Sequence, residues 1–258
     1  MDLQLQDKLY VITGATSGFG RAIAEALITE DAHIIINGRR EEKLLELQRQ
    51  YPDQIEIVAG DITTDATISK LVNTVGQRDL AGLVVNAGGP PAMSFVKSNI
   101  SDWDDAYESI LRWKVKLTKE LLPVLQKDNS GRIVYIESAS VKQPIENLVL
   151  SNSLRLAVVG FVKTLSNEVG HTGITMNIIA PGYHNTAAMD RLFANKSETL
   201  NISKEAAKEN FESEILAGQM GEPEDLASLA CWLLSPYSKY ITGQTISVDG
   251  GLIKSVFS

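Results

Sequence analysis

A serine and an arginine four residues apart, Ser151 and Arg155, stand in the segment "LSNSLR" near the middle of the chain. The segment opens a run over 150–165 that predicts a helix, and the i, i+4 spacing places both side chains on one face of it. A hydroxyl and a guanidinium can both donate hydrogen bonds to a ligand, but arginine stays protonated and serine is a very weak acid. The pair therefore predicts binding and positive charge rather than proton transfer.

A second candidate site is the glycine-rich segment "TGATSGFG" at 13–20, which follows an apolar run and opens a helical pattern. Gly14 permits a tight turn, Gly18 lets the backbone approach a pyrophosphate, and Gly20 lets helix and strand pack closely. The helix N-terminus then faces the phosphates. The segment predicts a dinucleotide-binding loop, and an ordinary glycine-rich turn is the alternative.

The elements that must position these residues follow a regular alternation of strands and helices. Short apolar, β-branched runs recur at 8–13, 33–38, 55–60, 83–88, 132–137, 175–182 and 244–251. Segments of helical period lie between them, which predicts an α/β fold: a three-layer αβα, doubly wound parallel sheet of about seven strands. No linker or repeat interrupts residues 1–258, so we expect a single domain. The least regular part is the polar stretch 183–203, and we expect a lid-like segment over about 183–216.

Composition and charge exclude several classes of function. The 258 residues are 44% hydrophobic and 22% charged, and the net charge of −8 disfavours an extended nucleic-acid surface. The only cysteine, Cys231, cannot form an internal disulfide, which fits a reducing cytoplasm. The first residues do not resemble a signal peptide, and no apolar run approaches the ~20 residues of a membrane span. No cluster of residues has metal-ligand spacing.

Four motifs together resemble the short-chain dehydrogenase/reductase family over nearly the whole chain. The family's T-G-x-x-x-G-x-G loop is matched by Thr13-Gly14, Gly18 and Gly20, and its N-A-G element is matched by Asn86-Ala87-Gly88. Its P-G element is matched by Pro181-Gly182. Residues 221–251 resemble the C-terminal end of 3-oxoacyl-[acyl-carrier-protein] reductases. The resemblance implies a Rossmann-like fold and a nicotinamide cofactor. The further residues that it implies at the cofactor are Thr16, Ser17, Phe19, Asp61, Ile62 and Thr186. It also implies a homotetramer, or a homodimer, with two long helices at about 101–127 and 150–169 paired across subunits.

The choice of cofactor depends on the end of the second expected strand. An acid there would bind a ribose 2′-hydroxyl and select NAD, but the strand ends "NGRR" with Arg39 and Arg40. Because arginine suits a 2′-phosphate, we expect Arg39 to favour NADP, while NAD remains possible. The alternative is that both arginines begin the next helix as solvated charges. Asp61 has an alternative role as a helix cap.

The resemblance also identifies candidate catalytic residues, namely Ser138, Ser151 and Arg155. Ser138 occupies the position of the family serine that binds the oxygen of a carbonyl or alcohol substrate. The tyrosine and lysine of the family are replaced by Ser151 and Arg155, and Ile110 stands where an asparagine belongs. Arg155 retains the ability to bind the cofactor ribose. We therefore expect a slow reductase, a reductase with a relocated acid, or a binding protein that has lost turnover.

Candidates for a relocated acid follow the P-G element. Tyr183 and His184 lie where the family's chain passes the nicotinamide, and histidine titrates near ~6.5. The alternative, which we favour, is that both belong to the lid and never reach the substrate. Lys142 and Glu137, near Ser138, are weaker candidates.

Overall fold

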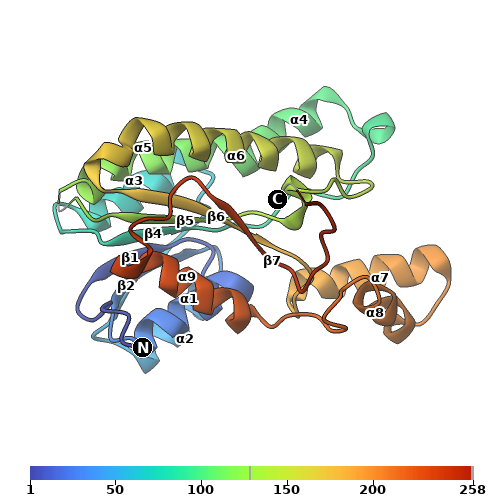
Figure 1. Ribbon diagram of the computed structural model, residues 1–258, viewed down its shortest axis with the longest axis horizontal. Helices are drawn as coiled ribbons and strands as arrows, with labels where there is room; N and C mark the ends of the chain where they lie inside the picture. The colour runs from blue at the N-terminus through green and yellow to red at the C-terminus, as the bar shows by residue number, and fades with distance from the viewer. Residues whose placement is uncertain (128, 257–258) are drawn as a thin grey trace.

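The computed structural model describes residues 1–127 and 129–256, and it contains a seven-stranded sheet in which all pairs are parallel (Figure 1). The strand order is β3-β2-β1-β4-β5-β6-β7. The strands are β1 (Leu9–Ile12), β2 (His33–Gly38), β3 (Ile55–Ala59), β4 (Gly82–Val85), β5 (Arg132–Ile136), β6 (Thr175–Pro181) and β7 (Thr245–Val248). The predicted strands are all present, each within a few residues of its expected ends.

Helices cover both faces of this sheet, which confirms the three-layer doubly wound architecture. The α-helices are α1 (Gly18–Thr29), α2 (Glu41–Gln50), α3 (Asp65–Val75), α4 (Ile100–Tyr107), α5 (Trp113–Leu125), α6 (Val149–Val169), α7 (Ala187–Leu200), α8 (Lys204–Glu212) and α9 (Pro223–Leu234). Helices α3, α5 and α6 lie on one face, and α1, α2 and α9 lie on the other (Figure 1). Every helix in the described chain is too short or too polar to span a lipid bilayer.

The strands are continuous apolar runs because both of their faces are buried. Successive side chains of a strand point to opposite faces. In β1, Val11 therefore joins the core under α3, α5 and α6, while Ile12 joins the core under α1, α2 and α9. Each face has its own apolar cluster, so the sheet is fixed from both sides.

The glycine loop, the N-A-G element, Ser138 and Gly182 follow the carboxyl ends of strands and therefore lie at one end of the sheet. The register pairs Ile12 with Val84, Val84 with Val134 and Ile136 with Ile179, so the residues after β1, β4, β5 and β6 are brought side by side. The strand order reverses between β1 and β4. In open α/β sheets, ligands bind in the crevice at such a reversal.

The expectation of an irregular polar stretch at 183–203 is wrong. Most of that stretch is α7, and α8 follows it, so the segment 183–216 is largely a helical pair beyond one end of the sheet (Figure 1). Its own small apolar cluster contains Met189, Ile215 and Met220. The two turn signals are Asn201, whose left-handed φ of 52° ends α7, and Ser203, whose side chain caps α8. Helices α7 and α8 form a small pair with its own core and contain few apolar residues. The helical spacing of those residues is therefore hard to detect in the sequence.

The two long helical segments agree with the expected ranges. Helix α6 matches 150–169 to within one residue. Helices α4 and α5 form one continuous segment, joined by a π-helical turn over Glu108–Arg112. Ile110 lies in this turn, and its side chain is buried in the core. A π turn of this kind is frequent at functional sites, where it changes which side chains face the sheet.

Candidate active site

The glycine loop after β1 is locked against the loop after β4. The hydroxyl of Thr13 donates to the carbonyl oxygen of Asn86 at 2.8 Å, and the Asn86 amide nitrogen donates back to that hydroxyl at 2.8 Å. A Cβ atom on Gly14 would lie 2.7 Å from the Asn86 oxygen, and one on Gly20 would lie 2.3 Å from the Gly14 oxygen. Side chains are therefore excluded at both glycines, and the two loops form one wall of the crevice.

The N-terminus of α1 opens into this crevice. Helix α1 begins at Gly18, and its cap residue, Ser17, makes no side-chain cap hydrogen bond. The first amides of the helix are therefore available to an anion such as a pyrophosphate. A Cβ atom on Gly18 would lie 3.6 Å from the Thr186 methyl carbon, so Thr186, which follows β6, borders the same space.

The arginine at the glycine loop is Arg40 rather than the expected Arg39. Its Nη2 donates to the hydroxyls of Thr16 and Ser17, both at 2.8 Å, whereas Arg39 is exposed and makes none of these contacts. Arg40 is also the residue before α2, so its position agrees with the helix-start alternative while its side chain turns back to the loop. The cationic group that borders the glycine loop is the guanidinium of Arg40.

Asp61 shapes the turn before α3 without capping the helix. Its Oδ1 accepts hydrogen bonds from the amide and the hydroxyl of Thr63, at 3.0 and 2.9 Å. The N-cap of α3 is Thr64, whose side chain accepts from the amide of Thr67. The cap alternative for Asp61 is therefore wrong. Ile62 is buried in the core beside it.

The structure places Ser151 and Arg155 on one face of α6, as their spacing predicts. Arg155 Nε donates to Ser151 Oγ at 3.1 Å, and both residues are buried. The i, i+4 geometry therefore produces a direct contact, and the guanidinium is oriented partly by the serine.

Arg155 also belongs to a buried ion cluster, which we define as Lys114, Glu137 and Arg155. Arg155 Nη1 donates to Glu137 Oε2 at 2.8 Å, and Lys114 Nζ donates to Glu137 Oε1. The exposed fractions of the three side chains are 3%, 0% and 9%. Burial lowers the pKa of Lys114, and the adjacent Glu137 carboxylate partly opposes this effect.

Lys114 was not a candidate in the sequence, although the sequence carries a signal for it. Its neighbours at helical spacing are Ile110 in the π turn and Leu117 and Leu121 in α5, which form one buried stripe. A lysine within such a stripe needs a buried counter-ion, because an isolated buried charge is too costly. The counter-ion is Glu137, at the carboxyl end of β5.

Ser138 follows Glu137 and lies at the mouth of the crevice. Its Oγ accepts the amide proton of Ser140 at 3.1 Å, and it donates its own proton to no other described residue. The side chain is partly exposed, so the hydroxyl is available to a substrate oxygen. Nearby, the hydroxyl of Ser140 is buried without a hydrogen-bond partner among the described residues.

Neither candidate for a relocated acid is poised to donate a proton. His184 is buried, with Nδ1 at 3.2 Å from the Gly182 oxygen and its ring edge-on to Phe19 at 5.0 Å between centroids. Burial lowers its pKa, which favours the neutral ring. The Tyr183 hydroxyl donates to Glu214 Oε2 at 3.3 Å. Burial and the Glu214 charge raise the pKa of Tyr183 to about 12, so it is a weak acid.

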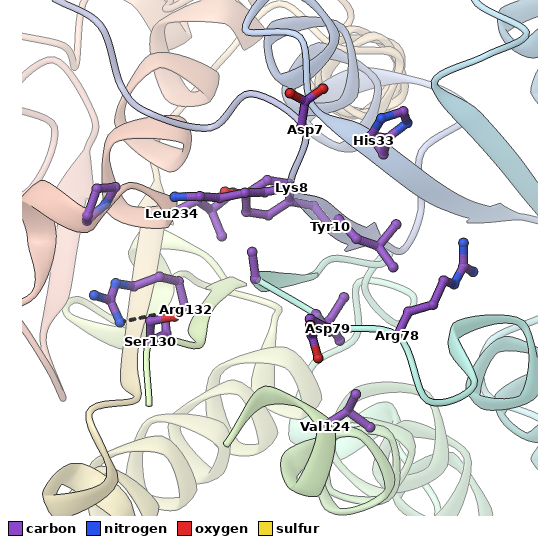
Figure 2. Close-up of a pocket in the computed structure, with 14 residues that line it drawn as sticks. Asp7, Lys8, Tyr10, His33, Arg78, Asp79, Val124, Ser130, Arg132 and Leu234 are labelled. Carbon is purple, nitrogen blue, oxygen red and sulfur yellow. Dashed lines mark hydrogen bonds between the residues drawn. The ribbon is translucent and has the colours of Figure 1, made fainter. Parts of the chain in front are cut away.

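Two cavities lie at opposite ends of the sheet. One of about 380 Å³ is bordered by Ala139 beside Ser138, by Tyr183 and Glu214, and by Leu252 from the C-terminal segment. The other, of about 400 Å³, is lined by Tyr10, Arg132 and Leu234 at the amino ends of the strands (Figure 2). The first adjoins the loops that follow β5 and β6, so it is the candidate substrate cavity.

Comparison with known proteins agrees with this geometry. A family model described as enoyl-(acyl carrier protein) reductase matches residues 14–253. The 3-oxoacyl-[acyl-carrier-protein] reductase FabG of Rickettsia bellii (strain RML369-C) is 31% identical over 251 residues, which cover 97% of this chain and 99% of that protein.

Solved structures give the same result at the level of the fold. The L-sorbose reductase of Gluconobacter frateurii, complexed with NADPH and L-sorbose, superposes with a TM-score of 0.93 at 27% identity, over 99% of this chain and 100% of that one. YwfH, an NADPH-dependent reductase involved in bacilysin biosynthesis, gives a TM-score of 0.91 at 26% identity, over 97% and 100% of the two chains. Together with the glycine loop and the parallel sheet, these matches show that the chain belongs to the short-chain dehydrogenase/reductase family of oxidoreductases.

Proposed function

We propose that the chain is an NADP(H)-dependent oxidoreductase that acts on a small carbonyl or alcohol substrate with altered acid–base residues. The observation that carries this proposal is the grouping of the glycine loop, Ser138 and Arg155 at one edge of the sheet, next to a cavity of about 380 Å³. The NADPH-dependent structural relatives support the choice of cofactor. The buried, unpaired Cys231 is consistent with a cytoplasmic enzyme.

Each residue of the proposed site has a separate role in binding the cofactor or the substrate. The cofactor supplies a hydride when it is bound. The first amides of α1 and the guanidinium of Arg40 would hold its phosphates, and the walls formed by Asn86 and Thr186 would fix its position. Ser138 would donate a hydrogen bond to the substrate oxygen, and Arg155 would supply positive charge toward the cofactor. Since neither Ser151 nor Arg155 is a useful acid, solvent in the cavity supplies the proton and the reaction is slow.

A dinucleotide-binding protein without turnover is the second candidate. It is favoured by the replacement of the family's acid and by the surroundings of Tyr183 and His184, neither of which is poised to donate a proton. Steady-state reduction of a panel of small ketones with NADPH distinguishes the two. Turnover that disappears in Ser138→Ala supports the oxidoreductase. Tight NADPH binding with no turnover on any ketone, and no oxidation of the matching alcohols, supports the binding protein.

We expect NADPH to bind more tightly than NADH, and we expect Arg40 to account for most of the difference. Replacing Arg40 by alanine removes a guanidinium from the hydroxyls of Thr16 and Ser17, where the 2′-phosphate is expected. Losing a charged hydrogen bond of this kind weakens NADPH binding by about 10- to 100-fold and leaves NADH binding nearly unchanged. Fluorescence titration of both cofactors measures the effect.

Two control variants make the cofactor titration specific. Arg39→Ala tests the residue that the sequence favoured, and Arg49→Ala removes an exposed arginine at the far end of α2. We expect a smaller effect for Arg39 and none for Arg49. Equal affinity of the unmodified protein for NADPH and NADH would contradict the proposed preference.

We also propose that the protein forms a homotetramer through the outer surfaces of α4, α5 and α6. Leu156 on α6 is 53% exposed and Tyr107 on α4 is 45% exposed, so the outer surface of these helices offers apolar area that a second subunit would bury. Multi-angle light scattering at micromolar concentration is expected to give four times the mass of the chain, and Leu156→Glu is expected to reduce it. A monomer would refute the tetramer, and a dimer would agree instead with the homodimer that the resemblance also allows.

A further inference from the structure

The buried ion cluster of Lys114, Glu137 and Arg155 joins three elements directly beneath the candidate site. Lys114 comes from α5, Glu137 follows β5 and precedes Ser138, and Arg155 comes from α6. Burying three charges costs several kcal/mol per ion unless the geometry and the hydrogen bonds compensate. Such a cluster next to Ser138 therefore requires an explanation beyond stability.

The hydrogen bonds of Arg155 leave one edge of its guanidinium unused. Nε donates to Ser151, and Nη1 donates to both the side chain and the backbone carbonyl of Glu137, at 2.8 and 3.0 Å. Nη2 makes no hydrogen bond with any described side chain or backbone group, and it lies 2.9 Å from the position that a Cβ atom on Gly89 would occupy. Glu137 and Ser151 thus fix the planar group so that Nη2 faces the loop after β4.

That loop is the wall of the cofactor crevice. It begins with Asn86, which is bonded to the glycine loop, and continues through Gly88 to Gly89. A side chain at Gly89 would press against the guanidinium. The unused edge of Arg155 therefore lies at this loop, where it remains able to donate to an oxygen acceptor of a bound ligand.

The charge of the cluster depends on Lys114. With all three groups ionised, the net charge is +1, and with Lys114 neutral it is zero. The groups that face Lys114 are Glu137 from β5 and Arg155 from α6, while the nearby hydroxyls of Tyr135 and Thr118 bond each other at 2.7 Å and stay neutral. The positive charge of protonated Lys114 thus balances the negative charge of Glu137, and the cluster keeps the positive charge of Arg155.

We propose that Lys114 and Glu137 are positioning residues for Arg155: Glu137 holds the guanidinium edge toward the cofactor crevice, and Lys114 preserves its positive charge there. This inference rests on the proposed function, since the acceptor is taken to be a hydroxyl or phosphate oxygen of the bound cofactor. Neither residue touches the cofactor itself. Their effect appears in the affinity for the cofactor and in its dependence on pH.

The pH dependence gives the sharpest test, because a purely structural role would not produce it. Burial lowers the pKa of Lys114, so its proton is lost at a lower pH than the proton of an exposed lysine. As pH rises through that pKa, the cluster charge falls from +1 to zero and NADPH binding weakens. We expect the loss to be about tenfold.

Three variants separate charge from shape. Lys114→Arg keeps the charge at alkaline pH, so its NADPH affinity is expected to stay constant between about pH 7 and 10. Lys114→Met has a similar length without charge, and it is expected to bind about tenfold more weakly at neutral pH, with no alkaline loss. Glu137→Gln weakens one of the three hydrogen bonds that orient Arg155, and we expect about 10- to 100-fold weaker binding.

Matched controls come from neighbouring lysines. Lys116→Met removes a partly exposed lysine of the same helix, and Lys142→Met removes a lysine near Ser138 whose pKa is also lowered by partial burial. Both are expected to keep the alkaline transition of the unmodified protein. Melting temperatures show whether each variant is folded, and affinities are compared only among folded proteins.

The outcomes distinguish this inference from the proposed function. If the unmodified protein binds neither NADPH nor NADH, the proposed function fails. If it binds NADPH but folded Lys114→Met and Glu137→Gln bind equally well at every pH, the inference is overturned and the proposed function stands. If Glu137→Gln does not fold, the contrast between Lys114→Arg and Lys114→Met still decides the question.

Discussion

Replacing Ser151 by tyrosine and Arg155 by lysine is expected to raise the rate of ketone reduction with NADPH by about 10²-fold or more. A positioned general acid contributes roughly 10²–10⁴ in rate, and the unmodified protein has only solvent for that role. Tyrosine titrates near ~10, and a neighbouring lysine ammonium lowers the pKa of a phenol, whereas serine and arginine cannot supply the proton. The double variant places an acid and a cation in the register that α6 already provides.

The structure limits how complete this recovery can be. Ile110 is buried in the π turn of the long helix and leaves no polar side chain where the family has asparagine. Glu137 and Lys114 also occupy the space beneath the new lysine, and Glu137 will pair with it as it pairs with Arg155. We therefore expect partial recovery, seen as a rise in kcat with a smaller change in KM.

The matched control is Ser151→Phe with Arg155→Lys, which has nearly the same volume as the tyrosine variant and lacks the hydroxyl. It is expected to remain at the rate of the unmodified protein or below. Ser151→Ala is expected to change turnover little, because Ser151 orients Arg155 and donates no proton to substrate. A collapse of turnover in Ser151→Ala would show that the serine takes part in the chemistry. Equal rates in the phenylalanine and tyrosine variants would show that the added phenol is not the acid.

The sequence predicts most of the fold because parallel strands buried on both faces leave continuous apolar runs. It also predicts the contact between Ser151 and Arg155, since that contact depends only on helical spacing. The pairing of Lys114 with Glu137 could not be predicted in the same way. The two residues are 23 positions apart and meet only when α5 packs on the sheet.

Some features of the site and of the fold depend on local geometry and cannot be predicted from residue types. Arg39 and Arg40 have the same chemistry, and only the turn between β2 and α2 determines that Arg40 reaches the glycine loop. Helices α7 and α8 pack chiefly against each other around a small cluster, so their apolar stripes are too sparse to stand out in the sequence. Ser151 and Arg155 share one face of α6 as their spacing predicts, but the contact of Arg155 with Glu137 depends on how α6 packs against the end of β5.

The largest effect on stability is expected at Glu137. Replacing it by leucine leaves Lys114 and Arg155 as two buried like charges without a counter-ion. Breaking a buried ion pair by removing one partner costs about 3–5 kcal/mol of the free energy of unfolding, because the remaining charge stays desolvated. Since domains of this kind have a total of only about 5–15 kcal/mol, the variant should still fold but melt at a clearly lower temperature.

An exposed ion pair in the same sheet provides the control for this prediction. Glu56 on β3 pairs with Arg78 at the surface, where both side chains are about half exposed. Glu56→Leu is expected to change the free energy of unfolding by no more than about 1 kcal/mol, since solvent screens such pairs. Urea denaturation of both variants measures the difference. A loss at Glu137 as small as that at Glu56 would mean that water reaches the cluster, and Lys114 and Arg155 would then need no counter-ion. The larger loss would show that the fold accepts a costly internal charge beside Ser138, which is the expected behaviour of residues kept for their effect on the site rather than for stability.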